Sequence, residues 1–169
     1  PAVARGFDAF KRTGLVGEVA TTYSDRLRYS TDNSIYQQLP QAVIYPKSKD
    51  DISILMTQLG ETKYRNIELT PRGGGTGTNG QSLTSGITMD MSRHMNRIIH
   101  IDYENDYAIV EPGVVLDQLN AIVSEKNKFF APNLSPSNRA TIGGMVNTDA
   151  CGQGSLIYGK TAQHLIELE

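Results

Sequence analysis

Residues 66–80 read NIELTPRGGGTGTNG. The first five residues favour a strand, which Pro71 ends. The loop that follows carries glycine at four of the five positions 73–77. Because glycine has no Cβ, the backbone of such a loop can approach a ligand closely and aim several amides at one anion. With Arg72 and the hydroxyls of Thr76 and Thr78 as further donors, the loop predicts a phosphate or pyrophosphate site; the alternative is a solvated linker.

Two well-known phosphate-binding motifs nearly match this loop. Residues 75–80 read G-x-G-x-x-G, but the dinucleotide fingerprint requires a helix to begin there. Residues 81–86, QSLTSG, are poor helix formers and lead into another apolar run. A Walker loop requires lysine at the position of Gln81. The sequence therefore excludes both a Rossmann site and a nucleotide triphosphatase.

A second loop offers similar chemistry. Residues 140–154 read ATIGGMVNTDACGQG, within a long stretch, residues 132–159, that is rich in Pro, Gly, Ser, Asn and Thr. Ordered loops of this length usually bind something. Paired glycines, threonine and asparagine again offer backbone amides and small donors. Two such loops predict a long ligand that has both phosphates and a flat polar ring, and FAD fits that description.

The rest of the pattern predicts an α+β fold. Apolar or alternating runs at 42–45, 87–91, 99–101 and 107–111 indicate strands, the last two joined by a polar turn. A helix is expected over residues 49–59, with Ser48 as its cap, Asp50 and Asp51 in its first turn and a left-handed Gly60 at its end. A second helix is expected over 115–123, and a weaker one over 15–27. Residues 164–169 alternate as a half-buried strand would.

Composition limits the class of protein. The 169 residues suit one ordinary domain, and the net charge of −2 gives no reason to expect a nucleic-acid partner. No apolar run is long enough to span a membrane, and no signal peptide is evident. The single cysteine, Cys151, fits a reducing compartment. The chain begins at Pro1 and stops inside an apparent strand, so we expect a fragment of a longer protein.

Motifs in a fixed order carry a family resemblance. They are TDNSIY (31–36), PQAVIYP (40–46), PRGGGTG (71–77), DMSRHMNRI (90–98), EPGV (111–114), FAP (130–132), ATIGG (140–144) and the run 152–159 that ends in YG. In these the chain resembles the FAD-binding domain of the vanillyl-alcohol-oxidase (PCMH-type) family, of the D-lactate and glycolate oxidase kind. Within that family it resembles large bacterial D-2-hydroxyglutarate dehydrogenases that carry a C-terminal iron–sulfur region.

The resemblance implies a fold of two α+β subdomains with FAD between them. This chain would hold the first subdomain and the start of the second, truncated. Residues 1–35 would be a helical lead-in, and residues 36–169 a partial PCMH-type FAD-binding domain.

The resemblance also implies which residues touch FAD. The first loop would hold the pyrophosphate through Arg72, Gly73, Gly74, Gly75, Thr76, Gly77, Thr78, Asn79 and Gly80. Pro112 and Gly113 would flank the cofactor channel. The flavin half would meet Pro132, Thr141, Ile142, Gly143, Gly144 and Asn147. Gly152, Tyr158 and Gly159 would close over the cofactor. Some relatives tether the flavin through a histidine where this chain has Gly75, so we expect non-covalent FAD.

The implied chemistry is hydride transfer from the α-carbon of a 2-hydroxy acid to flavin. The base and the carboxylate-binding cations would come from beyond residue 169, so this chain alone should be inactive and bind FAD weakly. An electron acceptor is required but not identified, and the resemblance implies an iron–sulfur cluster in the later region.

The expected location is the cytoplasm, and the alternative is peripheral attachment to the inner membrane. The alternative function is a non-catalytic module that binds a phosphorylated ligand or a partner.

Several reactive side chains have ordinary explanations. His94, His100 and His164 lack the spacing of metal ligands, so we expect no metal site. His94 should be a surface or turn partner, and His100 should point to solvent. Cys151 is expected to pack and Asp149 to stabilise a turn. Arg93, His94 and Arg97 are read as a solvated face.

Overall fold

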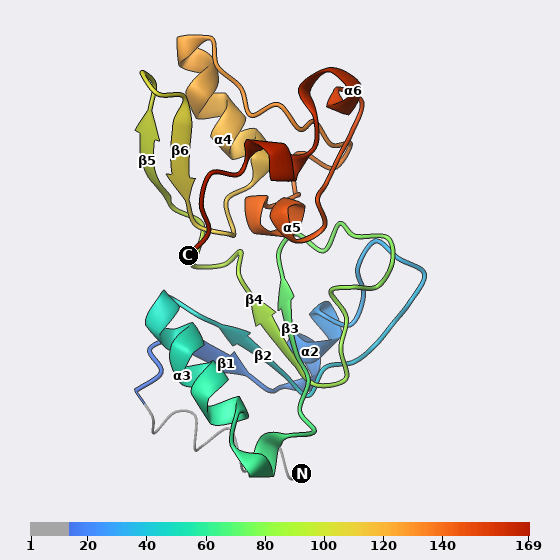
Figure 1. Cartoon of the computed structure of the whole chain (residues 1–169). Coiled ribbons are helices and arrows are strands. Elements are labelled where there is room, and N and C mark those ends of the chain that lie inside the picture. Colours follow the sequence, from blue (N-terminus) through green and yellow to red (C-terminus); the bar gives the residue numbers. More distant parts are fainter. Residues whose placement is uncertain (1–13) are drawn as a thin grey trace. The chain divides into compact units, whose positions relative to one another are not determined.

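The computed structural model describes residues 14–169. The chain divides into two units, Pro1–His94 (unit 1) and Met95–Glu169 (unit 2). Each unit has its own sheet and its own apolar core (Figure 1). Among the described residues, no helix combines the length and the apolar character needed to cross a membrane.

Unit 1 is built on a four-stranded sheet in the order β1-β2-β4-β3. The strands are β1 (Glu18–Ala20), β2 (Ala42–Tyr45), β3 (Leu69–Arg72) and β4 (Ile87–Asp90). β1 is antiparallel to β2, whereas β2 and β3 both run parallel to β4. Every residue of β2 and β4 is buried, as expected for central parallel strands covered on both faces. The predicted strands are therefore present, but β4 does not alternate between core and solvent. Pro71 does not end β3 as predicted, because it pairs with Met89 and the strand continues to Arg72.

Helix α3 (Lys49–Leu59) packs on this sheet (Figure 1). Its Leu55 joins Ala42, Ile44, Ile87 and Met89 in one buried cluster. The predicted cap is confirmed, since the Ser48 hydroxyl accepts a hydrogen bond from the Asp51 amide at 3.4 Å. The prediction of a left-handed Gly60 is wrong. Its φ of −68° is right-handed, because its amide continues the helical pattern to the Met56 carbonyl.

The predicted helix over residues 15–27 is wrong in its first half. Glu18–Ala20 form β1, and helix α2 covers only Tyr23–Arg28, capped by Thr22. β1 forms because Glu18 pairs with the distant Tyr45, a contact that no local pattern reveals. The first 13 residues of the predicted lead-in lie outside the described residues, and the division of the chain at residue 36 stays a prediction.

Unit 2 begins with the predicted hairpin. β5 (Ile98–Asp102) pairs antiparallel with β6 (Tyr107–Val110), with an irregularity between Ile98 and His100. This irregularity leaves Ile99 and His100 both exposed. Helix α4 (Leu116–Val123) is also confirmed, and its Leu119 and Val123 pack with residues of the hairpin.

Two short helices interrupt the predicted loop of unit 2. They are α5 (Ile142–Asn147) and α6 (Ser155–Tyr158). α5 begins where Thr141 caps it, although two of its six residues are glycine. The strand predicted over residues 164–169 is wrong: Thr161–His164 form a 3-10 turn, and residues 165–169 pair with no strand in the described part of the chain.

Candidate functional site

The glycine loop of unit 1 leaves the carboxyl end of β3, beside the parallel strand β4. Gly75 and Gly80 have φ of +64° and +72°, which side chains with a Cβ rarely adopt. Within the described residues, the amides of Gly75, Thr76, Gly77 and Thr78 donate no hydrogen bond. The loop thus presents a row of unpaired donors. Such a row fits a pyrophosphate, whose oxygens accept hydrogen bonds and carry negative charge.

Arg72 supports this loop from the side. Its guanidinium donates to the carbonyls of Thr31 at 2.8 Å and Tyr29 at 3.5 Å, and its Cζ lies 5.4 Å from the Tyr29 ring centre. The Asn33 amide in turn donates to the Gly75 carbonyl at 3.1 Å. Two of the Arg72 donors are therefore used within unit 1, and its expected direct contact with phosphate stays a prediction.

In unit 2, α5 begins against the segment 112–114. The Ile142 amide donates to the Val114 carbonyl at 2.8 Å, and the Gly143 amide donates to the Pro112 carbonyl at 2.9 Å. The Gly144 amide donates to the capping hydroxyl of Thr141 at 3.4 Å. The expectation that the paired glycines offer free amides is therefore wrong, because the Pro112 carbonyl and the Thr141 hydroxyl accept them.

Gly143 has a packing role instead. A Cβ at this position would lie 2.6 Å from the Pro112 Cβ and 2.9 Å from its carbonyl oxygen. Only glycine allows α5 to approach the segment 112–113 this closely. Gly143 of the ATIGG motif thus joins α5 to Pro112, one of the two residues expected to flank the cofactor channel.

The other residues of unit 2 that are expected at the flavin half, or expected to close over the cofactor, differ in accessibility. Gly144 and Asn147 lie three residues apart on α5 and are exposed, as is Tyr158. Pro132 is buried. The Gly152 amide donates to Ser155 Oγ at 2.9 Å, and the Gly159 amide donates to the Ser155 carbonyl at 2.9 Å. Side-chain or surface contact with a ligand is thus open to Gly144, Asn147 and Tyr158.

Glu111 holds the start of the segment 112–114, and the sequence did not single it out as a structural residue. Its carboxylate accepts hydrogen bonds from Arg97 Nη2 at 2.7 Å, Nε at 3.1 Å and the backbone amide at 2.8 Å. The Glu111 amide donates back to the Arg97 carbonyl. The hydrogen bonds from Arg97 lower the pKa of the Glu111 carboxyl. Glu111 therefore stays ionised and fixes the chain entering Pro112.

Unit 2 contains a pocket of about 420 Å³ that is lined mostly by residues not assigned to FAD from the sequence. Its apolar lining comes from the rings of Phe129, Phe130 and Tyr158, and its polar lining includes the amide side chains of Asn120 and Gln153. Of the residues assigned to FAD from the sequence, this pocket contains only Tyr158.

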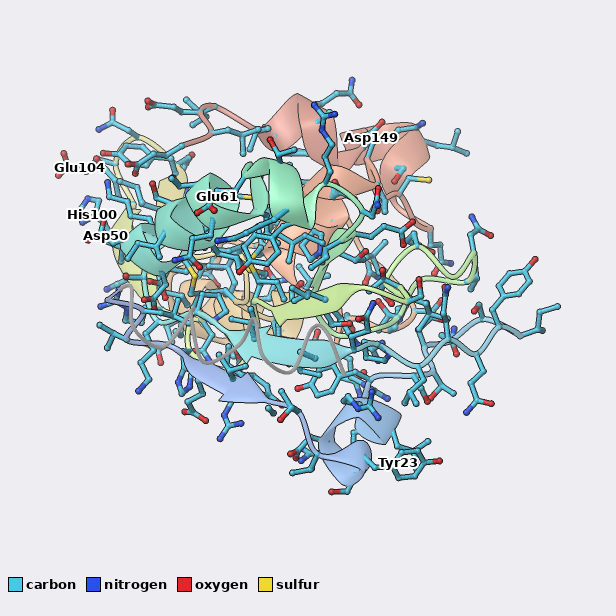
Figure 2. All side chains as sticks on the ribbon, turned by 90° about the horizontal axis from the view of Figure 1, so that it is seen from below. Tyr23, Asp50, Glu61, His100, Glu104 and Asp149 are labelled. Carbon is cyan, nitrogen blue, oxygen red and sulfur yellow. The ribbon has the colours of Figure 1, made fainter. Side chains whose placement is uncertain are left out.

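Most of the other reactive side chains behave as expected. His94 Nε2 lies 2.8 Å from Glu18 Oε1, and His100 is exposed, as Figure 2 shows. Asp149, also at the surface in Figure 2, has φ of 45° and accepts a hydrogen bond from the Ala162 amide at 3.0 Å. The expectation for Cys151 is wrong, because this thiol is exposed rather than packed. Arg93 and Arg97 are each paired with a glutamate.

Comparison with known proteins agrees with the resemblance seen in the sequence. A D-2-hydroxyglutarate dehydrogenase of Pantoea ananatis is 56% identical over 161 residues, which are 95% of this chain and 16% of that protein. Glycolate oxidase subunit GlcD of Bacillus subtilis is 40% identical over 147 residues, 85% of this chain and 30% of that protein. This chain therefore spans about a sixth of the length of the dehydrogenase.

Solved structures agree on the fold. The wild-type BBE-like 1 protein of Physcomitrella patens matches with a TM-score of 0.76 at 18% identity, over 93% of this chain and 33% of that one. The expected α+β, PCMH-type fold is thereby confirmed. The profile of the family described as "FAD binding domain" matches residues 40–169. Since these residues make up most of the chain, the chain belongs to the FAD binding domain family.

Proposed function

We propose that this chain is the FAD-binding part of a flavoprotein that oxidises a D-2-hydroxy acid of the D-2-hydroxyglutarate or D-lactate type. The observation that carries the proposal is the 56% identity to a D-2-hydroxyglutarate dehydrogenase over 95% of this chain. That alignment includes both loops on which the cofactor site depends. The glycolate oxidase relative, at 40% identity, supports the wider class of 2-hydroxy-acid chemistry.

The amides of Gly75, Thr76, Gly77 and Thr78 would hold the pyrophosphate, since no acceptor within the described residues occupies them. Of the exposed residues of unit 2, Gly144 and Asn147 would meet the flavin half and Tyr158 would close over the cofactor. Pro112 and Gly113, fixed by Glu111 and Gly143, would flank the channel. The contacts expected of the remaining residues of both loops, including that of Arg72 with phosphate, stay part of the proposal.

FAD, when bound, would accept the hydride that leaves the α-carbon of the 2-hydroxy acid. The residues of this chain would bind and orient the cofactor, while the substrate base and carboxylate-binding cations would lie in the rest of the protein. Gly75 carries no nucleophile, so the attachment would be non-covalent. A separate electron acceptor, with an iron–sulfur cluster in the later region as the relay, would reoxidise the flavin. We expect the protein in the cytoplasm or peripherally at the inner membrane.

The test is reduction of the flavin in the whole protein without oxygen. We expect D-2-hydroxyglutarate or D-lactate to bleach the flavin absorbance, and the L-enantiomers to leave it unchanged. Acid precipitation should release the flavin into the supernatant, because it is not covalently attached. A folded whole protein that cannot take up FAD would contradict the proposal. A protein that binds FAD but is reduced by no 2-hydroxy acid would favour a non-catalytic binding module.

A further inference from the structure

The segment 31–37 of unit 1 lies beside the glycine loop, and none of its residues is among the expected FAD contacts. It is a closed turn, because Thr31 and Gln37 form an antiparallel bridge and the Gln38 amide donates to the Ser30 carbonyl at 2.8 Å. Within the turn, Asp32 Oδ1 accepts from the Ser34 amide at 2.8 Å. The turn is thus an ordered structure with a defined tip at residues 32–36.

Several contacts fix this tip to the glycine loop. The Asn33 amide donates to the Gly75 carbonyl at 3.1 Å, and Ser82 Oγ donates to Asp32 Oδ2 at 2.9 Å. Arg72 Nη2 donates to the Thr31 carbonyl at 2.8 Å. The three partners are Arg72 at the start of the loop, Gly75 in its middle and Ser82 just beyond its end. The tip therefore has a defined position relative to the unpaired amides.

The tip of this turn exposes apolar side chains to solvent. Ile35 is 94% exposed and Tyr36 is 57% exposed. The Tyr36 ring lies against the end of the loop, since a Cβ on Gly80 would be 2.9 Å from Tyr36 Cδ2. The Tyr36 hydroxyl makes no hydrogen bond within the part of the chain that the structure describes. An exposed isoleucine and a half-exposed tyrosine side by side, at the rim of an anion cradle, suit a ligand that carries a flat ring beside its phosphates.

We propose that Ile35 and Tyr36 form an apolar lip that contacts one of the two flat rings of FAD, with Tyr36 as a further binding residue. This inference rests on the proposed function, because it takes FAD as the ligand of the glycine loop. Aromatic side chains stack on flat heterocycles through both dispersion and quadrupole contacts. The adenine and the isoalloxazine share this chemistry, and both are joined through short linkers to the pyrophosphate.

The test is equilibrium binding of FAD to the whole protein stripped of its flavin. We expect Tyr36→Ala to weaken FAD binding by about 5- to 150-fold, the range seen when a stacking aromatic is truncated. Tyr36→Phe should bind FAD nearly as well as the wild type, since the ring remains. Tyr23→Ala, which removes an equally exposed tyrosine that projects from α2 (Figure 2), should change nothing.

Binding of ADP and of FMN then identifies the ring. If Tyr36→Ala weakens ADP and spares FMN, the lip holds the adenine; the reverse result assigns it to the isoalloxazine. Ile35→Ser gives a second test. The Ile35 side chain is almost fully exposed, so this substitution should not impair folding. It should weaken binding of the same ligand that Tyr36→Ala weakens. If Tyr36→Ala and Ile35→Ser both bind FAD as tightly as the wild type, the proposal that these residues contact a ring of FAD is wrong. The proposed function would stand in that case, because the wild type still binds FAD.

Discussion

The Tyr29 hydroxyl donates a 2.5 Å hydrogen bond to Oδ2 of Asp90, whose side chain lies at the end of the central strand β4. The other carboxylate oxygen, Oδ1, accepts from the Ser92 amide, the Ser92 hydroxyl and the Arg93 amide. Burial and this hydrogen bond raise the pKa of Tyr29 far above the ordinary value of a phenol. Tyr29 therefore remains a donor, and it links α2 to the strand next to the glycine loop.

Removing this donor should destabilise unit 1. Tyr29→Phe leaves Asp90 Oδ2 buried without its partner, and the loss of a hydrogen bond to a charged group costs about 1.5–3 kcal/mol. Urea unfolding would measure the change in free energy of unfolding. Tyr23→Phe is the matched control, because Tyr23 is 63% exposed. If both variants unfold at the same urea concentration, the Tyr29–Asp90 bond contributes no stability.

Asp51 anchors the start of α3 to the edge of the sheet. It is 1% exposed, and its two oxygens accept from the Val16 and Lys47 amides, each at 2.8 Å. Asp51→Ala would leave both amides, whose bonds to Asp51 are partly buried, without this acceptor and should cost about 2–4 kcal/mol. Asp50→Ala is the control, since this neighbouring carboxylate is exposed on the same helix (Figure 2) and should change stability by less than about 1 kcal/mol. Equal losses of thermal stability in the two variants would contradict this role.

Asp51 also shows what the sequence could and could not predict. Apolar spacing and the Ser48 cap were enough to place α3, and alternation was enough for the β5–β6 hairpin, because these signals are local. The sequence assigned Asp51 only to the positive end of the helix. Its partner Val16 is 35 residues away, so its buried role depends on a contact that forms only in the folded chain.

The candidate site shows the same limit. The four-glycine loop and its open amides could be predicted, since their chemistry is contained in one short segment. In the second loop, the sequence marked Gly143 for its amide, whereas in the structure this amide is bonded to the Pro112 carbonyl and the residue packs closely on Pro112. Glycine permits both amide donation and close packing, and only the position of Pro112 distinguishes them. Helix α5 was missed because six residues with two glycines have little helical propensity of their own.

Stability of unit 2 should fall in acid through Glu111. Arg97 lowers the pKa of this carboxyl in the folded state, so the folded state favours the ionised form. The stabilisation is fully present above the unfolded pKa of about 4.3 and is lost as pH falls through the lower, folded pKa. Arg97→Gln removes the guanidinium and its charge, so acid unfolding should begin at a higher pH. Below that pH, the stability of the variant should depend less on pH than that of the wild type. Circular dichroism during acid titration would measure both changes.

The control for this titration is Arg28→Gln. Arg28 lies 4.0 Å from Asp25 in an exposed i,i+3 pair, and such pairs contribute little to stability. The acid transition of this variant should match that of the wild type. If Arg97→Gln also matched the wild type, the remaining bond from the Arg97 amide would be sufficient to hold Glu111, and the guanidinium would have no structural role.

Gly75 should be intolerant of any side chain, for two separable reasons. Its φ of +64° disfavours an L-residue by about 1–2 kcal/mol. In addition, a Cβ would lie 2.5 Å from Arg72 Nη2, which donates to the Thr31 carbonyl. Gly75→Ala should therefore lower the free energy of unfolding and weaken FAD binding to the whole protein. Gly60→Ala is the control, because φ is −68° there and alanine fits this conformation.

A double-mutant cycle separates the two reasons. In an Arg72→Ala background the contact with the guanidinium is absent, so Gly75→Ala should cost less than it does in the wild type, and the remaining cost reports the backbone strain alone. Gly75→Asn gives an independent measure, since asparagine tolerates the left-handed region but still carries a Cβ. If the cost of Gly75→Ala is the same in both backgrounds, the guanidinium moves aside freely. In that case the loop would depend on Gly75 for its conformation and not for the space beside Arg72.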